Sequence, residues 1–157
     1  MTLKERYHDA FAEDMMVENE VLLMRPDGRR TTLDKVLQGV RGKVAYVDFW
    51  ASWCRPCCAE MEPAAELRER MKGKDIEFIY LSTDEDHSKM CGALDELKLT
   101  GCHAYRILNP KAAKFMYEYN IQLFPRYMII DKNGKIVNDN APRPSSEEIE
   151  DILSDTL

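Results

Sequence analysis

Long apolar runs are missing from this chain. No stretch approaches the roughly 18 consecutive apolar residues that a membrane-spanning helix needs. The N-terminal segment MTLKERYHDAFAEDMM is interrupted by charges throughout, so it lacks the apolar core of a signal peptide. We therefore expect no membrane insertion, and the chain is either cytoplasmic or a mature domain whose targeting segment has been removed.

Basic clusters, repeats and long linkers are also missing. The formal net charge is -6, and no basic cluster or run of stacking aromatics is present, which argues against nucleic acid or an anionic membrane as a partner. No internal repeat or low-complexity tract divides the 157 residues. With 45% hydrophobic and 32% charged residues, the composition is that of one globular unit with a substantial core.

Cysteine pairs are scarce. Five cysteines are an odd number, so at least one has no partner within the chain, and a small disulfide-stapled scaffold is excluded. A structural metal site needs about four ligands, typically in two close pairs. Only Cys54 and Cys57 form such a pair, because Cys91 and Cys102 are eleven residues apart. We expect no metal.

The order of apolar patterns predicts an α/β architecture. Strands are expected over residues 21–24, 43–50, 76–81, 104–108, 127–130 and 136–137, with a further short strand before residue 33. Helices are expected over residues 3–15, 33–37 and 55–71, then after Thr83 or Asp84 as cap, from Asn109-Pro110, and after a capping box from Ser145 to Glu148. Strands that alternate with helices and end in a hairpin indicate a mixed sheet.

The segment VDFWASWCRPCCAEM, residues 47–61, places cysteines directly after a predicted strand. Cys54 lies where the next helix should begin, and Cys57 is about one helical turn further on, so the two sulfurs can reach each other. A helix N-terminus and the charge of Arg55 should lower the pKa of the Cys54 thiol. This arrangement predicts redox chemistry.

Asp48 is the only charged residue in the apolar run from Val44 to Trp50 that precedes these cysteines. Because burial of an unpaired carboxylate is costly, its pKa should be raised, and it could exchange a proton with the second sulfur. The alternative is a strand-end Asp that hydrogen-bonds to the backbone. The residue pattern leaves both interpretations open.

Several ordered segments resemble one known family. DFWASWCRPC resembles the active-site segment of thioredoxin-fold proteins, and GRRTTLDKVLQGVRGKVAYVDFWASWC, LSTDED and FPRYMIIDKNGKIV resemble the TlpA/ResA-like branch of thiol–disulfide oxidoreductases. The resemblance implies an α/β thioredoxin-like fold, with a central mixed β-sheet flanked by helices and a helix–strand insertion between residues 84 and 123. Residues 20–157 would form a single domain, and residues 1–19 an N-terminal helical extension.

The same resemblance implies roles for individual residues. Cys54 would be the attacking thiol and Cys57 the resolving thiol, Asp48 matches the buried acid of thioredoxins, and Glu60 matches a helix glutamate that some envelope members place near the cysteines. Substrate contacts would come from Trp53, Arg55, Pro56, Phe124 and Pro125, the last matching the family's cis-proline. A bulky Phe124 before the proline and an extra thiol at Cys58 depart from the family pattern, and they bear on redox potential and substrate rather than on fold.

The activity implied is that of a thiol–disulfide oxidoreductase that reduces protein disulfides through a mixed disulfide. Its partners would be protein disulfide or dithiol substrates and an upstream redox protein, with no cofactor, no metal and no nucleic acid, and the chain would act as a monomer. The family implies an extracytoplasmic location in the cell envelope, with the cytoplasm as the alternative.

Other functions fit the sequence less well. A redox-inactive or partner-binding domain would not need the dithiol, the acid and the proline together. A thiol peroxidase of this fold has Thr three residues before the reactive cysteine, where this chain has Ala51. A metal-binding module lacks a second ligand pair. Among the remaining thiols, Cys58 is expected to be a spectator, Cys91 a core residue and Cys102 a half-exposed loop residue.

Overall fold

The computed structural model describes residues 19–157, so the helix predicted over residues 3–15 lies outside the described residues. The described part contains seven strands and six helices. The strands are β1 (Leu22–Met24), β2 (Arg30–Thr32), β3 (Val44–Trp50), β4 (Ile76–Ser82), β5 (His103–Ile107), β6 (Arg126–Ile130) and β7 (Ile136–Asn138). The helices are α2 (Leu33–Gly39), α3 (Arg55–Ala59), α4 (Met61–Arg70), α5 (His87–Glu96), α6 (Lys114–Glu118) and α7 (Ile149–Thr156).

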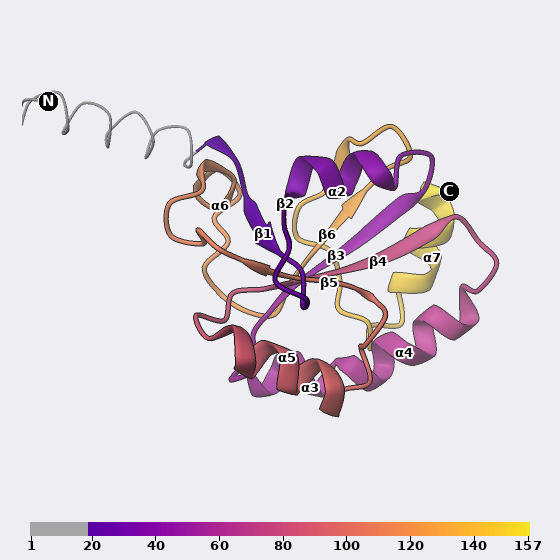
Figure 1. Ribbon diagram of the computed structural model, residues 1–157. Coiled ribbons are helices and arrows are strands. Elements are labelled where there is room, and N and C mark those ends of the chain that lie inside the picture. Colours follow the sequence, from indigo (N-terminus) through magenta and orange to yellow (C-terminus); the bar gives the residue numbers. More distant parts are fainter. Residues whose placement is uncertain (1–18) are drawn as a thin grey trace, which may run out of the picture.

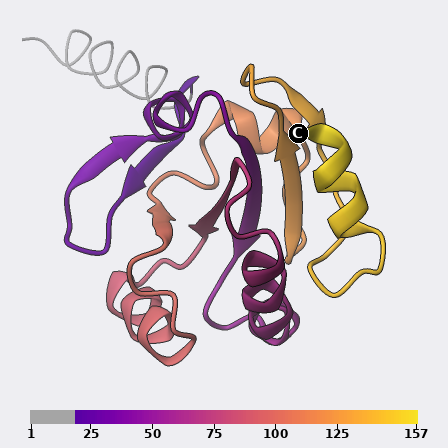
Figure 2. The same cartoon turned by 90° about the vertical axis from the view of Figure 1, so that its right-hand side faces the viewer.

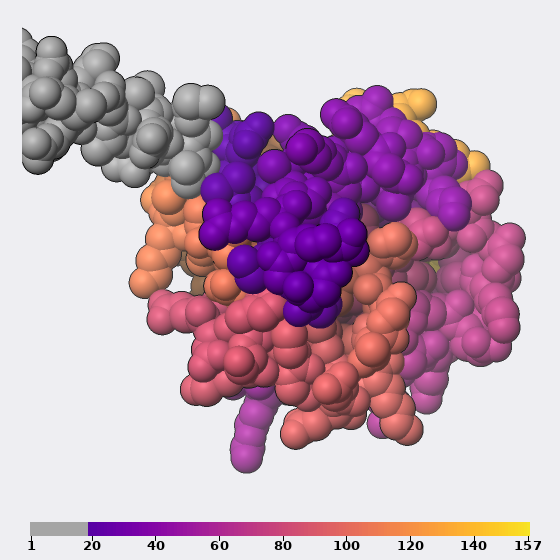
Figure 3. All heavy atoms as spheres, viewed as in Figure 1, coloured from indigo at the N-terminus to yellow at the C-terminus, as the bar shows by residue number. Residues whose placement is uncertain are grey.

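The strands form one mixed sheet in the order β2-β1-β5-β4-β3-β6-β7 (Figure 1). The strands β3, β4 and β5 are parallel to one another, whereas β1 and β2 on one side and β6 and β7 on the other are antiparallel to their neighbours. The predicted mixed sheet and the final hairpin are therefore confirmed. In the space-filling view, the β1–β2 hairpin, coloured indigo, forms part of the front of the molecule (Figure 3).

The central strand β3 is buried along its whole length. Side chains that alternate along a strand point to opposite faces of the sheet. Those of Ala45, Val47 and Phe49 pack with residues of α2 and α6 on one face. The opposite face is covered by α3, α4, α5 and α7, which contact Val44, Tyr46 and Trp50. The two layers of helices are seen in Figures 1 and 2. This double covering explains the nearly continuous apolar run in the sequence.

The long helix predicted over residues 55–71 is two helices, α3 and α4, which meet at Glu60. Pro63 explains the break, because it has no N–H to donate to the Ala59 carbonyl and its ring crowds that carbonyl. The break falls at Glu60, one of the predicted site residues.

Two predicted helix caps are wrong. The N-cap of α5 is Asp86, whose carboxylate accepts hydrogen bonds from the backbone N–H groups of Ser88 and Lys89, so neither Thr83 nor Asp84 caps this helix. The N-cap of α7 is Glu148, and Ser145 binds elsewhere. In both cases a tertiary contact takes the side chain that the local pattern assigned to a helix end.

The segment between β5 and β6 contains a shorter helix than predicted. The helix α6 begins at Lys114, not at Asn109-Pro110. The side chain of Asn109 instead accepts from the backbone N–H of Leu22 and donates to the carbonyl of Glu20. This segment is thereby tied to the start of β1. Within residues 19–157, no helix has the length and apolar character needed to cross a membrane.

Candidate active site

The two close cysteines lie where β3 passes into α3. Cys54 caps the N-terminus of α3 and forms a disulfide with Cys57, with a Cα–Cα distance of 5.3 Å. The backbone N–H of Cys57 donates a hydrogen bond to Sγ of Cys54, at 3.3 Å. After reduction, the same donor would favour negative charge on the Cys54 sulfur. Cys54 keeps 5% of its surface exposed and Cys57 none. Cys54 is thus the more accessible of the two sulfurs, as a thiol that attacks a substrate must be.

The proline loop lies against this pair. The peptide bond between Phe124 and Pro125 is cis, as the resemblance implies. Phe124 packs against the cluster that contains both cysteines, and its ring meets the Trp53 ring edge-on with centroids 6.4 Å apart. Trp53 is 68% exposed, and Arg55 and Pro56 are exposed beside it. The residues predicted to contact substrate thus come from two segments that meet next to the dithiol.

Asp48 lies inside β3, between Tyr80 of β4 and Tyr127 of β6. It is 4% exposed, and its Oδ1 has no hydrogen-bond partner among residues 19–157. Burial raises the pKa of Asp48 well above its usual range, and the charge of Glu60 raises it further. A raised pKa favours the protonated form of this carboxyl, because burial penalises its charge. Its place within the strand argues against the alternative of a strand-end Asp bonded to the backbone.

Glu60, at the junction of α3 and α4, is also buried. Its carboxylate accepts two hydrogen bonds from Ser145, one from the backbone N–H at 2.9 Å and one from Oγ at 2.8 Å. Ser145 precedes α7, so this contact ties the C-terminal segment to the helix that carries the cysteines. The structure thus brings Glu60 into electrostatic contact with Asp48, and it gives Ser145 a role that the capping-box pattern did not predict.

Asp84 was not predicted as a site residue. The sequence pattern gave Asp84 only a possible role as a helix cap, yet Asp84 is 2% exposed. Its carboxylate accepts hydrogen bonds from N and Oγ of Ser52 and from Oγ of Ser82. A signal for this contact does exist: Trp50 pairs with Ser82 in the parallel register of β3 and β4, so the residues two positions beyond each lie side by side.

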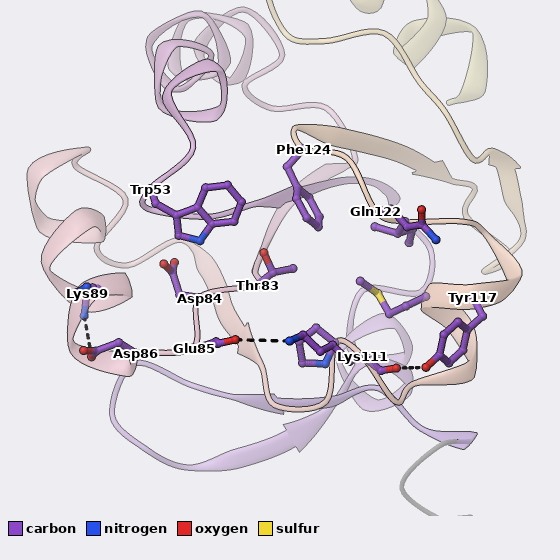
Figure 4. Close-up of a pocket in the computed structure, with 13 residues that line it drawn as sticks. Trp53, Thr83, Asp84, Glu85, Asp86, Lys89, Lys111, Tyr117, Gln122 and Phe124 are labelled. Carbon is purple, nitrogen blue, oxygen red and sulfur yellow. Dashed lines mark hydrogen bonds and ion pairs between the residues drawn. The ribbon is translucent and has the colours of Figure 1, made fainter.

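A pocket of about 740 Å³ opens beside the dithiol. Figure 4 shows Trp53 and Phe124 along one side of it, with Asp84 and Thr83 below them. Much of its wall is apolar and comes from Trp53, Phe124, Pro110, Met116 and Ile121.

Part of the charge on the pocket rim is engaged in contacts within the protein. Glu85 lies 3.8 Å from Lys111 in an ion pair, and Asp86 caps α5. Tyr117 donates its hydroxyl to the carbonyl of Lys111. The pocket therefore offers apolar surface and no excess of unpaired positive charge that would attract an anion.

Three cysteines remain free: Cys58, Cys91 and Cys102, all of them half-buried. Cys91 packs at the edge of the cluster under α5, and its thiol donates to the carbonyl of Pro26 at 3.7 Å. It is thus less buried than the core position predicted for it. Cys102 has the partial exposure expected from the sequence, and Cys58 lies next to the active-site turn.

Comparison with known proteins agrees with this geometry. The Redoxin family model matches residues 16–154. A curated relative, the thiol-disulfide oxidoreductase ResA of Bacillus cereus, is 29% identical over 117 residues, which cover 74% of this chain and 65% of the relative. The chain thus spans about 65% of the length of the ResA proteins it matches.

Two solved structures from Bacteroides vulgatus are similar. One, to which thiol-disulfide oxidoreductase activity is attributed, is 33% identical, superposes with a TM-score of 0.73, and covers 88% of this chain and 92% of its own. The other, a thioredoxin domain of a thiol-disulfide oxidoreductase, is 22% identical with a TM-score of 0.72 and covers 88% of this chain and 94% of its own. The predicted thioredoxin-like fold is confirmed.

Proposed function

Because this chain belongs to the Redoxin family, we propose that it is a thiol–disulfide oxidoreductase that reduces disulfides in other proteins. The observation that carries this proposal is the Cys54–Cys57 pair at the N-terminus of α3, packed together with the cis-proline loop. The activity of the curated relatives supports it.

In the proposed reaction, the thiolate of Cys54 attacks one sulfur of the substrate disulfide. A bond forms between Cys54 and that sulfur, and the other substrate sulfur leaves with the electron pair and takes a proton. The thiolate of Cys57 then attacks Sγ of Cys54, releases the second substrate thiol, and leaves the disulfide seen in the structure. The substrate gains two electrons and two protons, and the protein dithiol loses them.

Asp48 is proposed as the proton acceptor for Cys57. Cys57 is fully buried, so its thiol cannot lose a proton directly to bulk water, and Asp48 is a buried carboxyl whose raised pKa makes its carboxylate a stronger base. Glu60 is proposed to tune Asp48 through its charge, since it adds to the effect of burial on the pKa of Asp48.

The partner and setting follow from the same proposal. The oxidised protein must be reduced by an upstream dithiol protein before the next cycle. We propose that residues 20–157 act as one domain and as a monomer, and that the protein works outside the cytoplasm, as the resemblance to TlpA/ResA-like domains implies. We further infer that the pocket beside Trp53 and Phe124 receives apolar side chains of the substrate chain next to its reactive cysteine.

The activity is tested by reduction of insulin disulfides with the wild type, Cys54→Ser and Cys102→Ser. We expect turnover by the wild type, none by Cys54→Ser, and unchanged turnover by Cys102→Ser, which removes a thiol far along the chain from the pair. A Cys57→Ser variant should accumulate stable mixed disulfides through Cys54, and their identification by mass spectrometry would name the substrates. No turnover by the reduced wild type would contradict the proposed activity.

A further inference from the structure

The turn between β3 and α3 is held by one buried side chain. Asp84 follows β4 directly and accepts from Ser52 N at 3.0 Å and from Ser52 Oγ at 2.6 Å. A third bond comes from the fully buried Ser82 Oγ. Thr83 adds two more contacts, since its N and Oγ1 both donate to the carbonyl of Trp50. The end of β4 thus fixes the chain just before Trp53 and Cys54.

Cys58 lies on the other side of the same turn. Its backbone N–H donates to the carbonyl of Cys54 at 3.1 Å, and its thiol donates to the carbonyl of Ser52 at 3.7 Å. Ser52 therefore connects Asp84 to Cys58: its N–H and hydroxyl bind the carboxylate, while its carbonyl faces the thiol. If Cys58 lost its proton, this hydrogen bond would be lost and the thiolate would face the carbonyl oxygen, which cannot donate a hydrogen bond to it.

The charges around Cys58 act in the same direction. Burial raises the pKa of Cys58, and the carboxylates of Asp84, Asp48 and Glu96 raise it further. These groups come from the end of β4, from β3 and from α5. Because the thiolate is the attacking species, each of them makes Cys58 a weaker nucleophile.

A third thiol so close to the pair poses a problem for the proposed reaction. When Cys54 is bonded to a substrate sulfur, either Cys57 or Cys58 could attack Sγ of Cys54. Attack by Cys58 would break the bond to the substrate just as well, and the substrate sulfur would leave with the electron pair and take a proton. The product, however, would be a Cys54–Cys58 disulfide, whereas the structure contains the Cys54–Cys57 disulfide and a free Cys58.

We propose that Asp84 is a positioning residue that anchors the Ser52 turn and keeps Cys58 out of thiol–disulfide exchange, so that Cys57 alone resolves the mixed disulfide. This inference rests on the proposed oxidoreductase function. It gives the extra cysteine of the CRPCC sequence an explanation in the fold: the third thiol is tolerated because a buried carboxylate, through Ser52, holds it in its protonated form. In Figure 4 Asp84 lies beneath Trp53, among the residues that line the pocket.

The first test measures the reactivity of Cys58 in the oxidised protein. Cys54 and Cys57 are then blocked by their own disulfide, so within that segment iodoacetamide can label Cys58 alone. In Asp84→Asn we expect labelling of Cys58 at pH 8 to be faster by roughly threefold or more, with the rate–pH profile moved to lower pH, because the thiolate fraction rises when a nearby negative charge is removed. The matched control is Asp131→Asn, which changes an aspartate that binds the N–H groups of Asn133 and Lys135 in the β6–β7 turn.

The second test maps the product of one turnover. Reduced protein is mixed with oxidised glutathione, quenched with acid and blocked with N-ethylmaleimide, and the blocked cysteine is located by tandem mass spectrometry. Among the three cysteines of the CRPCC segment, the wild type and Asp131→Asn should carry the block on Cys58, because Cys54 and Cys57 have formed the disulfide; Cys91 and Cys102 are blocked in every variant. Asp84→Asn should carry a measurable fraction of it on Cys57, which reports a Cys54–Cys58 disulfide.

Three outcomes separate the possibilities. If Cys58 labelling and the position of the block in Asp84→Asn match those of Asp131→Asn, the proposed role of Asp84 is wrong. If Asp84→Asn does not fold, Ser52→Ala takes its place, because it removes only the hydroxyl donor. Cys58 labelling and the position of the block should then change in the same direction by a smaller factor. No change in Ser52→Ala would overturn the proposal. If the reduced wild type fails to react with glutathione or insulin, the oxidoreductase function fails, whereas the labelling test on the oxidised protein still decides whether Asp84 suppresses Cys58.

Discussion

Asp48 lies within β3 and Asp84 just beyond the end of the neighbouring parallel strand β4. Both aspartates are buried, and their surroundings are opposite. Asp48 has an oxygen without a hydrogen-bond partner among the described residues, and its pKa is raised. Asp84 is about as buried, yet its carboxylate accepts hydrogen bonds from Ser52 and Ser82. The first is suited to exchange a proton, and the second to hold a piece of backbone in place.

The difference comes from where each residue lies on its strand. Asp48 is in the middle of β3, where the backbone N–H groups of β3 and its neighbours are used by the sheet itself. Asp84 is beyond the end of β4, opposite a turn whose N–H groups have no sheet partner. Burial alone therefore does not decide the chemistry of a carboxyl group; the supply of donors does.

The largest expected effect on stability comes from removing the hydrogen-bonded carboxylate of Asp84. Asp84→Ala would leave the N–H and hydroxyl of Ser52 and the hydroxyl of Ser82 without their acceptor, and we expect a loss of about 3 kcal/mol in the free energy of unfolding. Urea denaturation of the oxidised protein measures this. The control is Asp131→Ala in the partly exposed β6–β7 turn, which should cost about 1 kcal/mol, and an equal loss in both variants would contradict the comparison.

Removing the unsatisfied carboxylate should instead cost activity. In Asp48→Asn the buried Cys57 loses its proposed proton acceptor, so the rate of insulin reduction near pH 7 should fall by about a hundredfold, equivalent to about 2.7 kcal/mol in the activation barrier. Single-turnover kinetics would place the loss in resolution of the mixed disulfide. A variant with normal resolution would show that Asp48 is not the acid/base group.

The same Asp48→Asn variant should be more stable than the wild type above neutral pH, by about 2 kcal/mol. In the unfolded chain the carboxyl ionises near its ordinary pKa of about 3.9, whereas in the folded protein the pKa is raised. The folded state therefore binds more protons between these two values, and stability is lost as pH rises through that interval. Urea denaturation from about pH 8 down to about pH 4 should show the advantage of Asn shrinking towards zero, and an advantage independent of pH would contradict the raised pKa.

Glu60 is intermediate between the two aspartates, because it is buried but receives two hydrogen bonds from one residue. Ser145→Ala removes the hydroxyl and keeps the backbone donor, so we expect a loss of about 1 kcal/mol in the free energy of unfolding. Ser146→Ala is the control, since Ser146 Oγ only accepts from the exposed N–H of Glu148. Equal losses in the two serine variants would show that the Glu60 contact contributes nothing beyond a surface turn.

Local signals in the sequence were sufficient for most of the fold. The apolar run that became β3, the alternation of strands and helices, and the final hairpin were predicted because burial on one or both faces leaves a regular pattern in the residues. The break at Glu60 also has a signal in the sequence, because Pro63 fits only the first turn of a helix and so indicates a helix that starts just before it, not one that runs from residue 55 to 71. The predicted helix caps were the weakest part. Asp84 and Ser145 are residue types that commonly cap helices, but in the fold Asp84 hydrogen-bonds to Ser52 and Ser145 to Glu60.

The sequence by itself determined the dithiol and the strand that carries it. Cys54 and Cys57 are one helical turn apart, and Asp48 lies in the apolar run just before them, so both spacing and burial are local properties of a short segment. Only the tertiary structure decided which side chains bind the buried carboxylates around that segment. Ser52 and Asp84 are 32 residues apart, and Glu60 and Ser145 are 85 apart; such contacts exist only after β3 pairs with β4 and α7 docks on the sheet, because hydrogen-bond partners follow from the packing of elements and not from chain order.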